Sequence, residues 1–165
     1  MTQTSITSVL TEDRRFPPPA EFAAAAEVGS QAAWDDMTER AARDRLGFWA
    51  EQAARLEWSR PWTEVLRWNN PNAQWFIGGE LNAAVNCVDR HARTWRRNKA
   101  ALIFEGEPGD TRTLTYQELH REVCRAANAL LALGIKKGDF VAIYLPMIPE
   151  AVVAMLACAR IGAPH

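Results

Sequence analysis

The last part of the chain constrains its fold most, because it has the pattern of a buried strand, a turn and an apolar helix. Residues 139–165 are DFVAIYLPMIPEAVVAMLACARIGAPH. The almost wholly apolar run from Phe140 to Leu145 is typical of a strand that is covered on both faces, as in a parallel sheet. Pro149 suits the first turn of a helix, Glu150 lies at its positive end, and Gly162 ends it. We therefore predict a βα unit of an α/β domain.

The stretch before it predicts a hairpin and a long helix. Residues 100–105 and 112–115 have strand-like patterns on either side of the turn GEPGD. Thr115 and Glu118 have the spacing of a capping box, and Gly134 supplies the helix stop. One face of that helix is apolar and consists of Leu119, Val123, Ala127, Leu130 and Leu131. Strand, helix, strand, helix is the beginning of a doubly wound α/β domain, which we expect to be incomplete because the sequence stops before a further strand.

The first part of the chain predicts helices. Residues 1–26 are polar and then proline-rich, so we expect a mobile lead-in with a short helical segment from Ala23 to Ala26. From Gln31 to Leu56 apolar residues recur at three- and four-residue steps. Asp44 is a candidate N-cap that divides this region into two helices, and Pro61 ends it.

A hairpin and another helix follow. Residues 64–68 and 74–77 predict short strands around the turn NNPN. Gly78-Gly79 then opens a loop, and the Asn82 side chain can cap a helix from Ala83 to Trp95.

Tryptophan is concentrated in this half of the chain. Of seven tryptophans, six lie between Trp34 and Trp75. Their helical spacing favours packing in a core, and a binding groove lined by aromatic rings is the alternative.

Composition bears on partners and compartment. The formal net charge is −1, so nothing indicates attraction to nucleic acid or to an anionic membrane. The basic run from Arg90 to Lys99 has apolar residues interleaved, which favours a solvated face over a nucleic-acid patch. The longest apolar run, Ala151 to Ala159, is too short to span a bilayer. The three cysteines lie far apart, which indicates reduced thiols in a cytoplasmic protein rather than a disulfide framework.

The candidate chemical groups have simpler explanations. Cys87 and His91 share a helix face, but Asp89 points elsewhere, so a hydrogen-bonding histidine is favoured over a metal site. The same pair as nucleophile and base would need a third group to hold the base. Gly78-Gly79 lies in GGELN, which matches neither phosphate-binding pattern and favours a turn. We predict no catalytic, cofactor-binding or metal-binding residue in this chain.

Three segments carry a family resemblance. They are FWAEQAARLEWSRPWTEVL, GGELNAAVNCVDRH and TLTYQELHREVCRAANALLALGIKKGDFVAIYLPMIPEAVVAMLACARIGAPH. The last two closely resemble the N-terminal part of AMP-forming acetyl-CoA synthetases, in the adenylate-forming superfamily. The first resembles the N-terminal extension of acetyl- and propionyl-CoA synthetases. The resemblance runs from about Glu27 to His165, and its last twenty residues are the most specific.

The resemblance implies an organisation and a reaction. Residues 1–26 would be the lead-in, residues 27–80 the acetyl-CoA-synthetase-type N-terminal extension, and residues 81–165 the first part of the AMP-binding domain, truncated. The fold would be a helical extension followed by the incomplete start of the doubly wound adenylate-forming large domain. The complete enzyme would join acetate to CoA through acetyl-adenylate, with ATP and Mg²⁺, and would release AMP and pyrophosphate.

The family's functional motifs have no match in this sequence. Its phosphate loop, acetate pocket, ribose-binding aspartate, CoA-binding arginines and catalytic lysine lie beyond the part that this chain resembles. We therefore expect the chain alone to bind none of ATP, Mg²⁺ and CoA, to be inactive and to self-associate through an exposed sheet edge. The alternative is a free-standing, non-catalytic module that binds a partner, such as the remainder of the synthetase.

Overall fold

The computed structural model describes residues 15–165. The chain divides into two compact units, Met1–Phe48 and Trp49–His165. The first fourteen residues of the predicted lead-in lie outside the described residues. Across the described residues, no helix combines the length and the apolar character that crossing a bilayer requires.

Three helices begin the described part of the chain: α1 (Ala20–Ala25), α2 (Gln31–Arg43) and α3 (Arg45–Ala53). The Asp44 carboxylate accepts a hydrogen bond from the Gly47 amide at 2.9 Å. This contact confirms the predicted break between two helices at Asp44. The second of them ends at Ala53, because the Arg55 and Leu56 amides bond to carbonyls only three residues back.

The first hairpin has the predicted place. Strand β1 (Glu64–Asn69) pairs antiparallel with β2 (Asn72–Ile77), and Glu64 lies opposite Ile77. The turn between them contains a cis peptide bond at Asn70–Pro71. Both strands are slightly longer than the sequence pattern predicts.

The helix predicted from Ala83 to Trp95 is not a continuous α-helix. Asn82 caps it as expected, accepting from the amides of Ala84 (2.9 Å) and Val85 (3.3 Å). The chain then forms a π-helical segment, η2 (Val85–Asp89), a short α4 (Arg90–Ala92) and a separate 3₁₀ turn, η3 (Trp95–Asn98). A π-helical turn holds one residue more than an α-helical turn. In this segment the consecutive residues Val88 and Asp89 are both buried.

A second hairpin leads into the longest helix. Strand β3 (Ala100–Glu105) pairs antiparallel with β4 (Thr111–Thr115), and α5 (Tyr116–Ala132) follows directly. The predicted capping box is present: the Thr115 hydroxyl accepts from the Glu118 amide, and the Glu118 carboxylate accepts from the Thr115 amide. Beyond the helix, Gly134 has a φ of +90°, a conformation that favours glycine.

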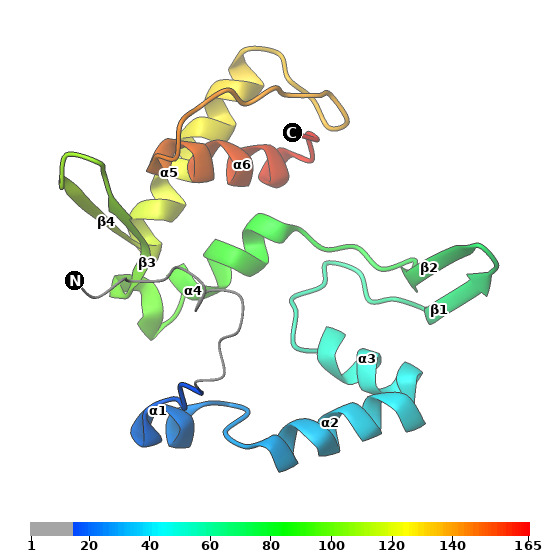
Figure 1. Cartoon of the computed structure of the whole chain (residues 1–165). Helices are drawn as coiled ribbons and strands as arrows, with labels where there is room; N and C mark the ends of the chain where they lie inside the picture. The colour runs from blue at the N-terminus through cyan, green and yellow to red at the C-terminus, as the bar shows by residue number, and fades with distance from the viewer. Residues whose placement is uncertain (1–14) are drawn as a thin grey trace, which may run out of the picture. The chain divides into compact units, whose positions relative to one another are not determined.

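The core lies where η2, the second hairpin and the last two helices meet. It consists of Val88, Leu114, Leu119 and Val123, with Val153 and Leu156 of α6 (Pro149–Ile161) packed against it. Helices α5 and α6 lie side by side (Figure 1). The last helix starts at Pro149 and ends at Gly162, whose φ is +76°, as the sequence predicts.

The strand predicted from Phe140 to Leu145 does not form. The segment contains no paired strand, and its one backbone hydrogen bond to the rest of the described residues joins the Val141 amide to the Pro164 carbonyl at 2.9 Å. An apolar run becomes a strand only when a neighbour completes the ladder. Among residues 15–165 the strands form two separate two-stranded sheets, so the mixed α/β fold is present with small and incomplete sheets.

Candidate functional site

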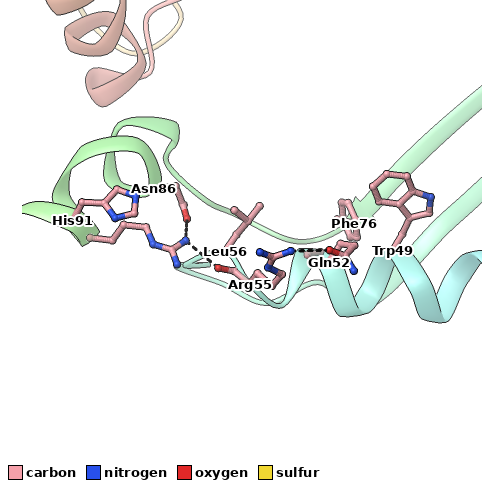
Figure 2. Close-up of a pocket in the computed structure, with 9 residues that line it drawn as sticks. Trp49, Gln52, Arg55, Leu56, Phe76, Asn86 and His91 are labelled. Carbon is pink, nitrogen blue, oxygen red and sulfur yellow. Dashed lines mark hydrogen bonds between the residues drawn. The ribbon is translucent and has the colours of Figure 1, made fainter. Parts of the chain in front are cut away.

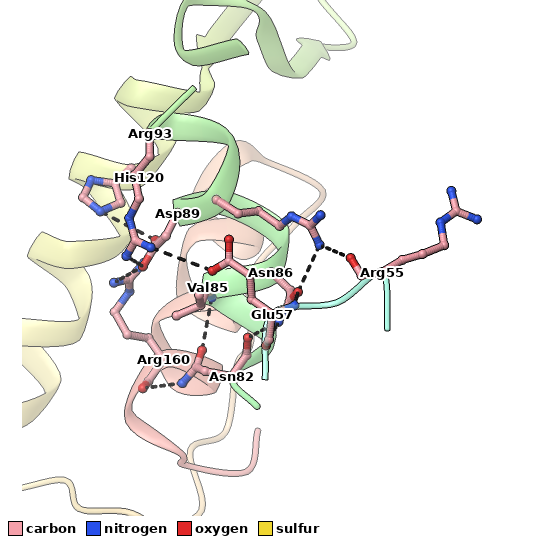
Figure 3. A network of polar contacts seen from close by, with 10 residues as sticks. Arg55, Glu57, Asn82, Val85, Asn86, Asp89, Arg93, His120 and Arg160 are labelled. Atoms are coloured by element: carbon pink, nitrogen blue, oxygen red, sulfur yellow. Dashed lines mark hydrogen bonds and ion pairs between the residues drawn. The ribbon is translucent and has the colours of Figure 1, made fainter. Parts of the chain in front are cut away.

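A buried ion pair joins two segments that are far apart in the sequence. The Asp89 carboxylate is 4% exposed as a residue and accepts from both terminal nitrogens of Arg160. His120 Nε2 lies 3.6 Å from Asp89 Oδ1, and Arg93 Nη2 lies 3.9 Å from Oδ2 (Figure 3). A buried carboxylate is tolerated because charged donors surround it. The pair therefore ties η2 to the last turn of α6.

Asn82 reinforces the same junction from its other side. Its Nδ2 donates to the carbonyls of Ala159 (3.2 Å) and Arg160 (3.0 Å), which belong to the last turn of α6. Its Oδ1 caps the start of the neighbouring helical segment. The Asn82 side chain thus provides hydrogen-bond partners for backbone amides at the start of one helical segment and for backbone carbonyls at the end of another.

Asn86 and Arg90 hold the segment after α3 against this helical segment. Asn86 Oδ1 accepts from the Glu57 amide at 2.8 Å, and its Nδ2 donates to the Glu57 carbonyl at 2.9 Å. Arg90 Nη1 donates to the Arg55 carbonyl at 2.9 Å and to Asn86 Oδ1 at 3.2 Å. These contacts join residues about thirty positions apart, and they form one wall of a pocket.

The pocket lies within the second compact unit and encloses about 550 Å³. Trp49 and Phe76 lie at one end and His91 at the other, with Leu56 between them (Figure 2). The lining therefore changes from aromatic and aliphatic to polar along the length of the pocket. A mostly apolar cavity with a few convergent polar groups is the usual form of a small-molecule site.

The electrostatics of the polar end centre on His91. Burial lowers the pKa of His91, with further lowering by Arg96 and Arg90, while Glu57 acts in the opposite direction. The ring is therefore neutral near pH 7. Arg96 Nη1 lies 3.4 Å from Nδ1, and the Tyr116 ring packs at 4.9 Å between centroids.

The three residues considered for a metal or nucleophile site have different surroundings. Asp89 is engaged with Arg160, Cys87 is exposed and His91 lines the pocket. Across residues 15–165, no group of three histidine, cysteine or acidic side chains could hold a metal ion. Burial raises the pKa of the Cys158 thiol, so that thiol stays protonated at neutral pH.

The glycines after β2 do not form a phosphate-binding loop. The Gly79 amide donates to the Phe76 carbonyl at 2.9 Å, and the Glu80 amide donates to the Arg60 carbonyl at 2.8 Å. A phosphate cradle needs free backbone amides that converge on one point. These amides are occupied, so the predicted turn is the correct interpretation.

The core-packing interpretation of the tryptophans is wrong for most of them. Trp58 and Trp62 are half-buried and pack edge-on at 4.9 Å between ring centroids. The exposed tryptophans of the block from Trp34 to Trp75 are Trp34, Trp49, Trp68 and Trp75. Trp49 lines the pocket, so one member of the block has the groove role that was the alternative.

Apart from the Asn82 cap, the polar junction was missed from sequence. Asn82, Asn86 and Arg90 are spaced by four residues and so share one face of the helical segment. Such a repeat of polar residues next to a glycine loop is a local signal for side chains that bind backbone. The Asp89–Arg160 pair has no comparable signal, since 71 positions separate its members.

Two family models match the chain in succession. Residues 34–87 match the acetyl-coenzyme A synthetase N-terminus, and residues 88–165 match the AMP-binding enzyme family. The junction of Asn82 and Asn86 with Asp89 and Arg160 therefore draws residues from both matched regions.

Curated relatives and solved structures agree with these models. The chain is 60% identical over 157 residues to an acetyl-coenzyme A synthetase of Gemmatimonas aurantiaca, covering 95% of this chain and 23% of the relative. It is 58% identical over 166 residues to an acetyl-coenzyme A synthetase of Streptomyces avermitilis, covering 100% of this chain and 25% of the relative. The acetoacetyl-CoA synthetase from Streptomyces lividans superposes with a TM-score of 0.72 at 37% identity, over 87% of this chain and 22% of that structure. The chain spans about a quarter of the length of these relatives.

Proposed function

The chain belongs to the AMP-forming acetyl-CoA synthetase family, whose N-terminal part it matches, and from this membership we propose that it is the N-terminal part of an acetate–CoA ligase. The observation that carries the proposal is the 60% identity over nearly the whole chain to one such synthetase. The reaction would convert acetate, ATP and CoA to acetyl-CoA, AMP and pyrophosphate through acetyl-adenylate.

This part of the enzyme would contribute scaffold rather than chemistry. Its buried polar groups bind backbone and one another: Asn82 holds the end of α6, and Asp89 pairs with Arg160. No lysine stands in a glycine-rich phosphate loop. Cys124 Sγ lies 3.7 Å from His120 Nε2, but this same nitrogen faces Asp89 Oδ1 at 3.6 Å, so Asp89 does not hold the ring through its other nitrogen as a nucleophile–base pair requires. Catalytic, cofactor-binding and metal-binding residues would therefore lie outside these 165 residues.

We propose that this part of the enzyme does not hold the family's cofactors. ATP with Mg²⁺ needs amides for its phosphates and oxygen ligands for the metal, whereas the glycine-loop amides at Gly79 and Glu80 are occupied. ATP, Mg²⁺ and CoA would bind elsewhere in a complete synthetase.

We also propose that the protein is cytoplasmic and has neither a nucleic-acid nor a membrane partner. The three cysteines are free thiols, which suits a reducing compartment. Most of the basic run is solvent-exposed on its short helical turns, and the formal net charge of the chain is −1. The run is a solvated face, and the net charge gives the chain no overall attraction to a polyanion.

The activity prediction concerns the 165-residue chain by itself. We expect the purified chain to catalyse no acetate-dependent exchange of labelled pyrophosphate into ATP, because the family's phosphate loop and catalytic lysine have no match in its sequence. The matched control is the same chain continued, in one polypeptide, by the region that follows in the Streptomyces avermitilis relative, which is 58% identical to it in the shared part.

The control also tests the proposed function. A soluble chimera that exchanges pyrophosphate with acetate shows that this chain can serve as the N-terminal part of the ligase. A folded chimera without any exchange contradicts that role. Exchange by the 165-residue chain alone, in material free of host synthetase, contradicts its inactivity and favours a module with chemistry of its own.

A further inference from the structure

The pocket described above has an aromatic and aliphatic end and a polar end (Figure 2). At one end, Trp49 presents an exposed ring that packs edge-on against Trp75 at 6.2 Å between centroids. Leu56 in the middle is 43% exposed. An apolar surface of this kind gains free energy when a ring or an alkyl chain covers it.

The backbone at Phe76 shows that the aromatic end is held in one arrangement. Phe76 has a φ of +53°, in the left-handed region that a bulky side chain rarely adopts. Its ring is fixed by contacts with Trp58 at 5.5 Å and Trp62 at 5.3 Å between centroids. Such strain persists only where the surroundings impose it, and it is common at ligand-binding positions.

The opposite end supplies hydrogen-bond donors. Arg90 Nη1 is engaged with the Arg55 carbonyl and Asn86, which fixes the direction of the guanidinium. Arg96 donates to His91 Nδ1, so the proton of the neutral His91 ring lies on Nε2, where it can be donated. The residues that line the pocket include arginine and histidine but no aspartate or glutamate. The Glu57 carboxylate also acts on His91, but it lies outside the lining and 3.8 Å from Arg93 Nη1, so the Arg90 guanidinium still makes this end favourable to a negative charge.

We propose that this pocket binds a small monoanion with an apolar body, with its carboxylate or similar group at Arg90 and His91 and its body against Trp49, Leu56 and Phe76. Its volume of about 550 Å³ is in the range of small-molecule sites. The family's motifs for acetate, ATP and CoA have no match in this sequence, so a ligand in this pocket would be additional to them. It therefore goes beyond the synthetase reaction.

Titration calorimetry of the full chain with naphthylacetate and its neutral amide, naphthylacetamide, tests the proposal without any synthetase assay. The two probes share one body and differ in charge. We expect saturable binding of the acid and binding of the amide weaker by about tenfold or more, because a charge-assisted hydrogen bond is worth at least that much. Equal affinities would overturn the anion-binding part, and the absence of saturable binding by the acid would overturn the whole proposal.

A pair of variants at Leu56 locates the binding. The Leu56 side chain is partly exposed and carries none of the pocket's polar contacts, so both variants should fold. Leu56→Glu should abolish acid binding by repulsion, whereas Leu56→Gln, which is the same size and neutral, should retain much of it. Leu133→Glu, at a 79% exposed position outside the pocket, should change nothing. Equal effects of the two Leu56 variants, or loss of binding in Leu133→Glu, would place the binding elsewhere and overturn the proposal.

Discussion

At the scale of single residues, Thr115 decides where α5 begins. Its hydroxyl accepts from the Glu118 amide at 3.2 Å, and without it that amide loses its partner. We expect Thr115→Ala to lower the free energy of unfolding by about 0.5–2 kcal/mol, measured by urea denaturation. Thr115→Ser keeps the hydroxyl and should cost much less. Equal losses in the two variants would mean that the cap contributes no stability.

The reciprocal bond gives Glu118 a pH-dependent role. Hydrogen bonds from the Thr115 amide and then from its hydroxyl lower the pKa of Glu118 below its ordinary value of 4.5, and Arg121 adds to the shift. A carboxyl whose pKa is lower in the folded state stabilises that state above its unfolded pKa. This contribution is lost as the pH falls through the folded pKa.

Glu118→Gln should therefore flatten the acid side of the stability curve. The difference in unfolding free energy between wild type and variant should be largest near pH 7 and should shrink as the pH falls below about 4. Urea denaturation at several pH values measures it. The pKa of Glu150 is also lowered, by its hydrogen bond to Arg112. Glu150 therefore makes the stability of both proteins sensitive to acid, so only the difference between wild type and variant reports on Glu118. A difference that is constant with pH would contradict the assignment.

At the scale of elements, α5 is stabilised by the face that it buries. Val123 is fully buried among Val88, Leu114 and Leu119, whereas Leu131 on the same helix is 51% exposed. We expect Val123→Asp to prevent cooperative folding, because it places an unpaired charge in the core. Leu131→Asp should cost less than about 1 kcal/mol. Thermal unfolding followed by circular dichroism compares them, and equal small effects would mean that the helix is not packed as described.

Elements whose determinants lie close together in the sequence are predictable from it, and elements built from distant partners are not. Asp44, Thr115 and Gly162 set helix boundaries through bonds to residues within five positions, so spacing alone predicted them. The π-helical segment η2 ends at Asp89, which is buried against Arg160, and no local pattern encodes that pair. The pocket likewise needs α3, β2 and α4 to meet, which explains why sequence reasoning did not find it.

At the scale of the whole molecule, the segment around the predicted strand is an unusual surface. Phe140, Tyr144 and Met147 are 87%, 102% and 91% exposed, although their sequence pattern is that of a buried strand. Between Val141 and Ile148, no backbone amide of the described structure donates a hydrogen bond to another backbone group. Covering each large side chain would gain about 1.5–3 kcal/mol, and an unpaired extended segment is a template for another strand.

We therefore expect the 165-residue chain to self-associate at micromolar concentration through residues 140–147, which sedimentation velocity measures directly. Tyr144→Lys should shift the population towards monomer, because charge on an exposed edge opposes pairing. Leu133→Lys, at a position that is 79% exposed but outside this segment, should leave the association unchanged. Amide hydrogen exchange should be fast from Phe140 to Leu145 in the monomer and slower in the associated form. A monodisperse wild-type monomer with strongly protected amides in this segment would contradict the prediction. It would mean that the chain covers its own apolar segment, as a free-standing module must.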